Sequence, residues 1–236
     1  MKLRQIGAEN EANRHRWVIR ILKRLPKGSK LLDAGAGEQR YKRFCRHLKY
    51  VSQDFGQYIN SQDNRGLHTD KWDYGRLDIV SDITKIPVKS DSFDAVLCTE
   101  VFEHIPEPVV AVREFHRILK KGGKLIITAP FNSLTHFAPY HFYGGFNIYF
   151  YREILPRMGF NIIEVRHNGN YFEYIAQEIR RLPSMAKRYS KTNAVLLLGL
   201  TIFILPVLLL MGYFSNRDKG SDEVLCFGYH VLAEKK

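Results

Sequence analysis

Cysteine is scarce in this chain of 236 residues. Its three cysteines, Cys45, Cys98 and Cys226, are far apart and never form a C-x-x-C pair. An odd number at such spacing argues against a disulfide framework and against a structural zinc site, and it fits a reducing compartment. The first 17 residues also lack an apolar core, which argues against a secretory signal. We therefore expect a cytoplasmic protein.

Acidic residues are few relative to basic ones. The chain has 24 Asp and Glu against 36 Lys and Arg, a formal net charge of +12. This balance favours anionic membranes, acidic substrates or nucleic acid as partners, and it also fits a solvated basic surface with no partner. Because basic residues are nowhere interleaved with aromatic ones in a run, we expect no nucleic acid partner and rank a membrane or an acidic substrate first.

Short apolar segments alternate with helical patterns along most of the chain. The segments expected to be strands are 30–34, 50–54, 78–82, 93–99, 124–129, 160–166 and 224–233. Apolar residues at helical spacing predict helices over 9–25 and 109–119, the second ended by Lys120, Lys121 and Gly122. This alternation predicts an α/β fold in which a largely parallel sheet is covered on both faces.

The segment LLDAGAGEQRY places an acid and a G-x-G sequence directly after the first strand. Gly35 and Gly37 lack a Cβ, so the backbone can approach a ligand closely there. Asp33 and Glu38 lie beside that backbone, where they would repel a pyrophosphate and suit an ammonium or sulfonium group. Arg40 stands where the dinucleotide fingerprint G-x-G-x-x-G has its third glycine, which argues against a pyrophosphate cofactor.

Polar residues also end the next three predicted strands. Asp54 lies about twenty residues further on, where an acid can accept hydrogen bonds from ribose hydroxyls, although an acid there can also be a helix cap or a surface residue. Asp82 is placed to take an adenine amino group while Ile83 packs on the ring. Thr99 and Glu100 end the fourth strand. In an open α/β sheet such strand ends meet at one ligand-binding crevice.

Together these residues resemble the class I S-adenosylmethionine-dependent methyltransferases. The resemblance covers roughly residues 15–166. It is carried by LLDAGAGE, by Asp54, by DIVSDITKIPVKSDSFDAVLCTEVFEHIPEP and by LKKGGKLIITAP. The middle stretch looks especially like the small-molecule methyltransferases. One departure is Gln39, where many members have a further glycine.

The resemblance implies S-adenosyl-L-methionine as the cofactor and a Rossmann-like, doubly wound sheet of seven strands, mostly parallel with an antiparallel last strand. It places Gly35 and Gly37 along the methionine part of the cofactor. The residues it implies at the cofactor are Asp33, Gly35, Gly37, Glu38, Asp54, Phe55, Asp82, Ile83, Thr99 and Glu100.

Three histidines are candidates for the catalytic base: His104, His136 and His141. A base is needed only if the acceptor is a hydroxyl or a protonated amine. His104 can alternatively brace the helix that follows it. His136 and His141 lie beyond the fifth strand, where the family places substrate contacts. Since no suitably spaced carboxylate accompanies these two histidines in their own segment, we expect no metal site.

Residues 194–214 form an uncharged apolar segment of 21 residues, long enough to span a membrane. A single span would separate strands 160–166 and 224–233 if those strands pair. Pro206 is expected to break the segment into two short apolar halves, and basic residues flank it on both sides. We expect a membrane-embedded hairpin or an interfacial insertion at the cytoplasmic face, with burial in protein or a dimer contact as the alternative.

The chain is therefore expected to be a single methyltransferase domain over 1–236, with a helical insertion over 176–222. Its acceptor is expected to be a small molecule or a lipid-linked compound at a membrane surface. A non-catalytic adenosyl-binding or membrane adaptor protein, and an oxidoreductase, remain as alternatives. The sequence leaves the identity of the acceptor and the oligomeric state open.

Overall fold

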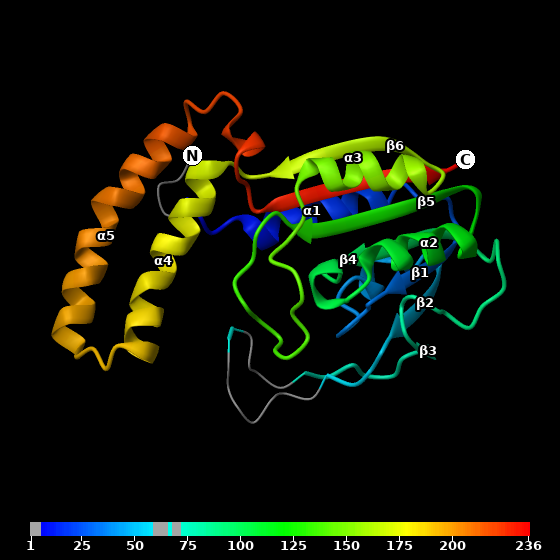
Figure 1. The fold of residues 1–236 in the computed structure, drawn as a ribbon, viewed down its shortest axis with the longest axis horizontal. Helices are drawn as coiled ribbons and strands as arrows, with labels where there is room; N and C mark the ends of the chain where they lie inside the picture. The colour runs from blue at the N-terminus through cyan, green and yellow to red at the C-terminus, as the bar shows by residue number, and fades with distance from the viewer. Residues whose placement is uncertain (1–5, 59–65, 68–71) are drawn as a thin grey trace. The chain divides into compact units, whose positions relative to one another are not determined.

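The strands of the chain form one seven-stranded mixed sheet (Figure 1). The computed structural model describes residues 6–58, 66–67 and 72–236. The strand order is β3-β2-β1-β4-β5-β7-β6. The strands are β1 (Lys30–Ala34), β2 (Lys49–Asp54), β3 (Ile79–Val80), β4 (Phe93–Thr99), β5 (Leu119–Pro130), β6 (Phe160–Asn168) and β7 (Gly228–Lys235). This arrangement confirms the predicted Rossmann-like fold class.

The first five strands run parallel, and β7 runs antiparallel to β5. β1 and β4 are apolar and buried, as expected for strands covered on both faces. The backbone N–H of Lys236 donates to the carbonyl of Gly159, and that of Phe227 donates to Asn168. These two bonds join opposite ends of β6 and β7, so the predicted pairing of these strands is confirmed.

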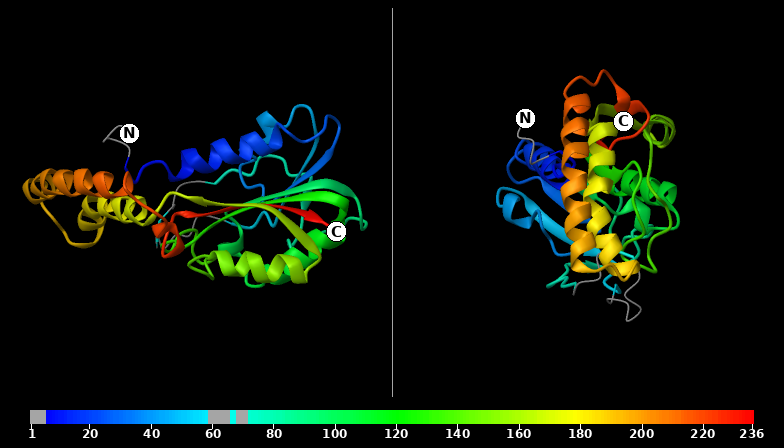
Figure 2. Two further views of the ribbon diagram at one scale, coloured as in Figure 1. Left: turned by 90° about the horizontal axis from the view of Figure 1, so that it is seen from above. Right: turned by 90° about the vertical axis from the view of Figure 1, so that its left-hand side faces the viewer.

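Helices cover both faces of this sheet. The helix α1 (Asn10–Leu22) lies on one face, and α2 (Pro108–Ile118) and α3 (Ile148–Arg157) lie on the other (Figure 2). On the first face, Trp17 and Ile21 pack in one buried cluster with Leu31, Leu97 and Ile126 of the central strands. Removing these apolar surfaces from water contributes roughly 25 cal/mol per Å², so the covered sheet is the stable part of the fold.

Several boundaries differ from the expected ones, and β7 begins at Gly228 instead of residue 224. β3 has only two residues, because Asp78 on one side accepts hydrogen bonds from the backbone and hydroxyl of Ser52. Lys120, Lys121 and Gly122 do not end α2 but begin β5, whose first residue pairs with Phe93 across a register shift. The helix α3 was not predicted. Its start is fixed by Asn147, whose side chain accepts from the N–H groups of Tyr149 and Phe150.

The chain divides into two compact units. The first comprises Arg14–Arg166 and Gly228–Lys236 and holds most of the sheet. The second comprises the described part of Met1–Asn13 together with His167–Phe227, and its main elements are α4 (Tyr171–Tyr189) and α5 (Ala194–Ser215). Within it, Ile204 and Leu208 of α5 share a buried cluster with Ala176 of α4. The seam between the two helices is therefore a narrow apolar stripe.

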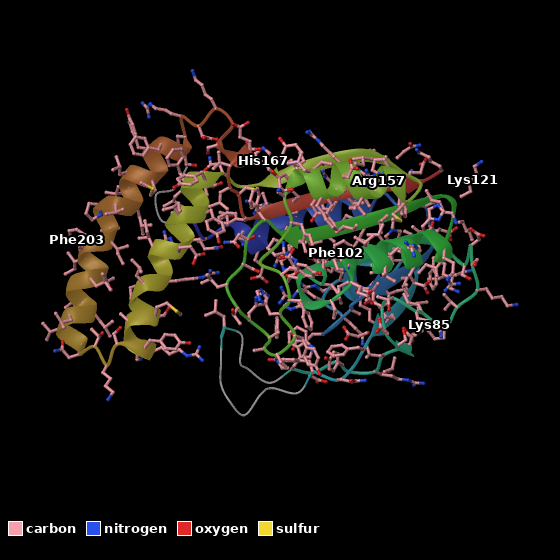
Figure 3. All side chains as sticks on the ribbon, in the orientation of Figure 1. Lys85, Phe102, Lys121, Arg157, His167 and Phe203 are labelled. Atoms are coloured by element: carbon pink, nitrogen blue, oxygen red, sulfur yellow. The ribbon has the colours of Figure 1, made fainter. Side chains whose placement is uncertain are left out.

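The helix α5 contains Pro206 and continues through it as one helix of 22 residues. The expectation that Pro206 breaks the apolar segment in two was therefore wrong. Proline removes one backbone N–H donor from the helix, and the remaining backbone hydrogen bonds on both sides keep the helix continuous. Most of the outer surface of α5 is exposed, as for Phe203 at 71% (Figure 3).

Among the described residues, α5 is the one helix long and apolar enough to cross a membrane, a property that core helices of soluble proteins share. Here only 11% of its most apolar window is buried in the protein. The described residues therefore do not bury this segment in the protein's own core, which was the alternative expectation.

Candidate functional site

The loop after β1 contains the two glycines that the sequence singled out. Both have positive φ angles, +73° at Gly35 and +50° at Gly37, a region that favours glycine. The space a Cβ would fill at Gly35 is occupied by the side chain of Val101, and at Gly37 a Cβ would lie 2.6 Å from the ring of Trp72. Side chains of the protein itself therefore approach both glycines closely, Val101 at Gly35 and Trp72 at Gly37.

Gln39 replaces the further glycine common in the resembled family, yet its backbone adopts the same left-handed conformation, with φ +54°. Its side-chain amide donates to the carbonyls of Tyr74 and Arg76 at 2.9 and 2.8 Å. These bonds offset the strain of a side chain at positive φ. They also tie the loop after β1 to the segment that precedes β3.

Asp54 lies at the end of β2 and holds the same loop. Its carboxylate accepts from the N–H of Gly37 at 2.9 Å and from that of Gly56 at 3.2 Å. Burial raises the pKa of Asp54, and the bond from Gly37 is the largest opposing effect. The N–H of Phe55 also contributes to lowering this pKa. A carboxylate has about four lone-pair positions, so it can accept a further hydrogen bond from a ligand.

Asp33 lies deeper, at 2% exposure, and accepts a hydrogen bond of 2.6 Å from the hydroxyl of Tyr50. Burial raises the pKa of Asp33 to about 7, and the charge of Asp54 adds to the shift. Glu38, on the other side of the loop, is exposed. The predicted acids of this loop therefore have different surroundings.

Asp82 is exposed, and its side chain accepts from the N–H and the hydroxyl of Thr84, both at 2.7 Å. These bonds fix the turn after β3 and place the buried side chain of Ile83 behind it. At the end of β4, Glu100 accepts from Thr128 at 2.8 Å and pairs with Arg14 at 2.8 Å. Asp33, Asp54 and Glu100 thus place carboxyl groups at the carboxyl ends of β1, β2 and β4. Burial raises the pKa of Asp33, and Arg14 offsets the charge of Glu100.

A cluster of aromatic rings, which the sequence reading did not identify, lies beside this loop. Ring centroids of its members are 4.9 to 6.4 Å apart. The members of this aromatic cluster are Phe55, Tyr58, Trp72, Phe137 and Tyr140. A signal existed in the density of aromatic residues after β5, but the partners before β3 have no periodic pattern.

The three predicted histidines lie together next to the aromatic cluster. The rings of His104 and His136 have centroids 4.6 Å apart, and that of His141 is 4.9 Å from His136. Both His104 and His136 are also within 5.5 Å of the ring of Phe137, at 5.5 and 5.4 Å. The loop after β4 and the loop after β5 therefore meet through these side chains.

Glu103 joins this group, and the sequence reading missed it. Its Oε1 lies 3.6 Å from Nε2 of His104 and 3.9 Å from Nε2 of His136. The side chain is 1% exposed, and among the described residues its Oε2 has no hydrogen-bond partner. Burial raises the pKa of Glu103 well above its usual range, and the charge of Glu100 adds to this.

The positions of these groups are held by the backbone. The carbonyl of Glu103 accepts from the N–H of Phe142 at 2.8 Å and of Tyr143 at 3.3 Å. Phe102, one residue earlier, is fully buried against the rings of Phe115 and Phe146 (Figure 3). The short 3-10 helix η2 (Phe102–His104) is therefore anchored from both sides.

His141 differs from the other two histidines in its polar contact. Its Nε2 lies 3.1 Å from the hydroxyl of Ser133. Burial lowers the pKa of His141, so its ring is neutral at neutral pH. The hydroxyl of Ser133 donates its proton to the carbonyl of Gly144 at 2.8 Å, so Nε2 of the neutral ring donates to Ser133 and Nδ1 keeps the lone pair that a proton acceptor needs.

A separate open pocket of about 540 Å³ lies between the start of α2 and α3. It is lined by Pro106, Tyr143, Phe146 and Phe150, among others. None of the predicted cofactor residues or histidines lines it, so it adds nothing to the site at the strand ends.

Comparison with known proteins agrees with this geometry. The model of a methyltransferase domain matches residues 32–127. The ubiquinone biosynthesis O-methyltransferase of Xanthomonas oryzae pv. oryzae is 48% identical over 40 residues, 17% of each chain. The demethylmenaquinone methyltransferase of Mycobacterium tuberculosis is 30% identical over 111 residues, 46% of this chain and 43% of that protein. The chain thus spans less than half the length of these curated relatives.

Solved structures share the whole fold at low identity. The [4+2]-cyclase SpnF superposes with a TM-score of 0.56 at 19% identity, covering 95% of this chain and 81% of that one. Phosphoethanolamine N-methyltransferase 2 of Haemonchus contortus, in complex with S-adenosyl-L-methionine, superposes with a TM-score of 0.51 at 19% identity, covering 94% and 52%. Because one of these proteins is a cyclase, the fold by itself does not decide the reaction.

Proposed function

We propose that this protein is a class I S-adenosylmethionine-dependent methyltransferase that methylates a small or lipid-linked acceptor at a membrane surface, and the methyltransferase-domain model that matches residues 32–127 supports this. S-adenosyl-L-methionine is the cofactor of that family. The membership, the cofactor and the enzyme class agree with the predictions made from the sequence.

The observation that carries the proposal is the adjacency of two groups of side chains. Trp72 lies against Gly37 on the loop after β1, and its ring is 4.9 Å from that of Phe137. Phe137 in turn contacts the rings of His104 and His136. A cofactor on the first loop and an acceptor at the histidines would thus lie within one aromatic cluster, as a direct transfer requires.

The acids and the aromatic cluster would hold the cofactor. Asp54 has lone pairs left for ribose hydroxyls, and the buried Ile83 offers an apolar surface to an adenine beside Asp82. The further residues proposed here are Asp33, Gly35, Gly37, Glu38, Phe55, Thr99 and Glu100. When bound, S-adenosyl-L-methionine supplies a methyl group on a cationic sulfur, which carboxyl groups at the strand ends favour over an anionic cofactor.

The histidines would serve the acceptor. Among the three we assign the proton acceptor to His141, because burial lowers its pKa and its ring is neutral at neutral pH. It would take the proton of an acceptor hydroxyl as the oxygen becomes bonded to the methyl group. The aromatic rings around Phe137 would exclude water from the same space and so prevent loss of the methyl group to solvent.

The membrane part of the proposal depends on α5. Its exposed side chains are large and apolar, and they include Leu196, Leu198, Ile202, Leu205 and Leu210. An uncovered apolar surface of this size is typical of a binding surface for lipid or for another protein. The flanking cations favour anionic lipid. The names of the two curated relatives, which mention ubiquinone biosynthesis and demethylmenaquinone, support a lipid-soluble acceptor.

The charges at the tip of the helix pair decide how α5 would enter lipid. Lys187, Arg188 and Lys191 lie at the turn between α4 and α5. A hairpin inserted tip first would carry these three cations into hydrocarbon, at about 3 kcal/mol each. An orientation with α5 in the plane of the interface keeps them among the headgroups. We therefore favour interfacial binding over a deep hairpin or a full span.

Methyl transfer is tested with the full chain, labelled S-adenosyl-L-methionine and a membrane lipid extract, with water-soluble small molecules as a second acceptor pool. The proposal expects label in one of the pools, and none with Asp54→Ala. If S-adenosylhomocysteine binds but no acceptor pool becomes labelled, the non-catalytic alternative holds. If label enters only water-soluble acceptors, the methyltransferase activity is supported and a lipid-linked acceptor is excluded.

Membrane binding is tested by flotation with vesicles that contain phosphatidylglycerol. The triple variant Ile202→Gln, Leu205→Gln, Leu209→Gln should bind about 100-fold more weakly, because three exposed apolar side chains are lost from the interface. A matched variant, Tyr149→Gln, Ile163→Gln, Val224→Gln, changes three exposed apolar residues outside α5 and should bind as the wild type does. Equal binding of both variants would contradict the role of α5.

A further inference from the structure

We propose that Glu103, His104 and His136 form a binding site for one divalent transition-metal ion, of which zinc best fits the donors. Two imidazole nitrogens and one carboxylate oxygen are a donor set that binds zinc in open, reactive sites. The role given below to this ion rests on the proposed function, whereas the binding of the ion does not.

The donor atoms are already close together. One ligand atom from each of the three residues lies within 4.8 Å of the other two. The oxygen of Glu103 is 3.6 and 3.9 Å from the two Nε2 atoms. Tetrahedral coordination at metal–ligand distances near 2.1 Å places ligand atoms about 3.4 Å apart. A contraction of a few tenths of an ångström would therefore complete these contacts.

The backbone selects the tautomer that metal binding requires. Nδ1 of His104 lies 2.5 Å from the carbonyl of Tyr140, and Nδ1 of His136 lies 2.8 Å from that of Leu134. A carbonyl oxygen can only accept, so both Nδ1 atoms carry the proton. Each Nε2 then presents a lone pair toward the carboxylate of Glu103. This second-shell pattern is common for histidines that bind metals.

The buried carboxyl group of Glu103 is the part of the cluster that calls for a cation. Its Oε1 is 3.6 and 3.9 Å from the two Nε2 atoms, distances too long for hydrogen bonds. Glu103 is 1% exposed, and its second oxygen has no hydrogen-bond partner within the described part of the chain. A buried polar atom of this kind requires an explanation. One divalent ion would satisfy this carboxyl group, with the two histidine nitrogens as its further ligands.

An ion held by three protein donors keeps a coordination position for the substrate. The ring of His141 lies 4.9 Å from that of His136, so a hydroxyl bound at that position would be near the proposed base. The ion would polarise that hydroxyl and orient its oxygen. The site thus favours acceptors that bear a hydroxyl, such as phenols or enols, over amines and carboxylic acids.

The experiment measures binding of zinc and of cobalt(II) to the full chain after treatment with a chelator. We expect one equivalent of either metal per chain, and visible absorption bands of tetrahedral cobalt(II). His136→Ala and Glu103→Gln should each weaken zinc binding about 100-fold or more, since each removes one ligand. His47→Ala is the matched control, because His47 is half buried elsewhere and its Nε2 contacts the carbonyl of Leu22.

S-adenosylhomocysteine affinity is measured on the same samples, which separates this inference from the proposed function. Normal cofactor affinity in His136→Ala with lost metal binding supports the site. Absence of metal binding in the wild type overturns the metal site. Equal zinc affinity of His136→Ala and His47→Ala overturns it as well. In either case the three residues form a protonated hydrogen-bond network instead. Failure of the wild type to bind S-adenosylhomocysteine, with metal binding intact, would instead overturn the proposed function.

Discussion

At the ends of β1 and β2 the buried acids Asp33 and Asp54 accept hydrogen bonds from Tyr50, Gly37 and Gly56. Beyond β4 the buried acid Glu103 has an oxygen with no partner among the described residues. The buried acids in one half of this sheet edge thus have hydrogen-bond donors, whereas the buried acid in the other half has an oxygen without one among the described residues. We call them the cofactor half and the acceptor half.

This difference shows how one edge can serve two ligands. The cofactor half is complete without its ligand, because local backbone and side-chain donors hold the acids in place. The acceptor half lacks a cation, which a metal or a proton must supply. The cofactor loop is thus expected to be preformed, whereas the acceptor half is expected to depend on what binds there.

The largest effect on the comparison is expected from Gly35→Val. A side chain there would overlap Val101, and φ is +73°, so the free energy of unfolding should fall by about 3 kcal/mol. Gly28→Val is the matched control. Gly28 has φ +84° with no atom within 4 Å of the added Cβ, so only the backbone strain of about 1 kcal/mol applies. Urea denaturation measures both. Equal losses would mean that packing at the cofactor loop matters little.

Asp54→Ala tests the acid that holds the cofactor loop. It removes the acceptor for the N–H of Gly37 and the proposed partner of the ribose, so S-adenosylhomocysteine affinity should fall about 100-fold, or about 2.8 kcal/mol. Asp218→Ala is the matched control, since Asp218 likewise accepts from a glycine two residues later, Gly220 at 3.2 Å, in the other unit. Calorimetry that finds unchanged affinity in Asp54→Ala would place the cofactor elsewhere.

The effect that is smallest over one pH unit is the pH dependence that comes from Asp33. Burial raises its pKa in the folded state from 3.8 to about 7, so the folded state keeps a proton that the unfolded state loses. Its contribution to stability is full below about pH 4 and is lost as the pH rises to about 7. The free energy of unfolding of Asp33→Asn minus that of the wild type should therefore rise with pH in that range, by up to about 1.4 kcal/mol per pH unit.

Asp78→Asn should show the opposite sign. The backbone N–H of Ser52 lowers the pKa of Asp78 below 3.8, so that contribution is present above about pH 4 and is lost as the pH falls further. Denaturation between pH 4 and 7 should show a changed slope for Asp33→Asn and an unchanged slope for Asp78→Asn. A flat difference for Asp33→Asn would mean that its carboxyl is ionised in the folded state.

The fold could be predicted because its signals are local. β1 and β4 were located to the residue, since a buried strand is a short apolar run between breakers. The prediction failed where an element's boundary is set by contacts with distant parts of the chain. β5 begins at Leu119, earlier than its apolar run, because Phe93 pairs with that residue. Pro206 lies within a continuous helix because local propensity is a weak guide when neighbouring residues are all apolar.

The candidate site divides in the same way. The acids at the strand ends could be predicted because parallel strands carry their ends to one edge. Trp72 and Glu103 could not be assigned, since their partners Gly37 and His136 come from distant parts of the chain. For Glu103 a signal was present. It directly precedes His104, yet a carboxylate for the histidines was sought only beyond β5.

The central claim is that the cofactor binds on the loop of Gly35 and Gly37, against Trp72. The chain has two tryptophans, and the other, Trp17 of α1, is buried against the sheet. Titration with S-adenosylhomocysteine should change the tryptophan fluorescence of the wild type in a saturable way, and Trp72→Phe should show no such change while calorimetry still detects binding. Calorimetric binding to the wild type with no fluorescence change, or the same change in Trp72→Phe, would contradict the account.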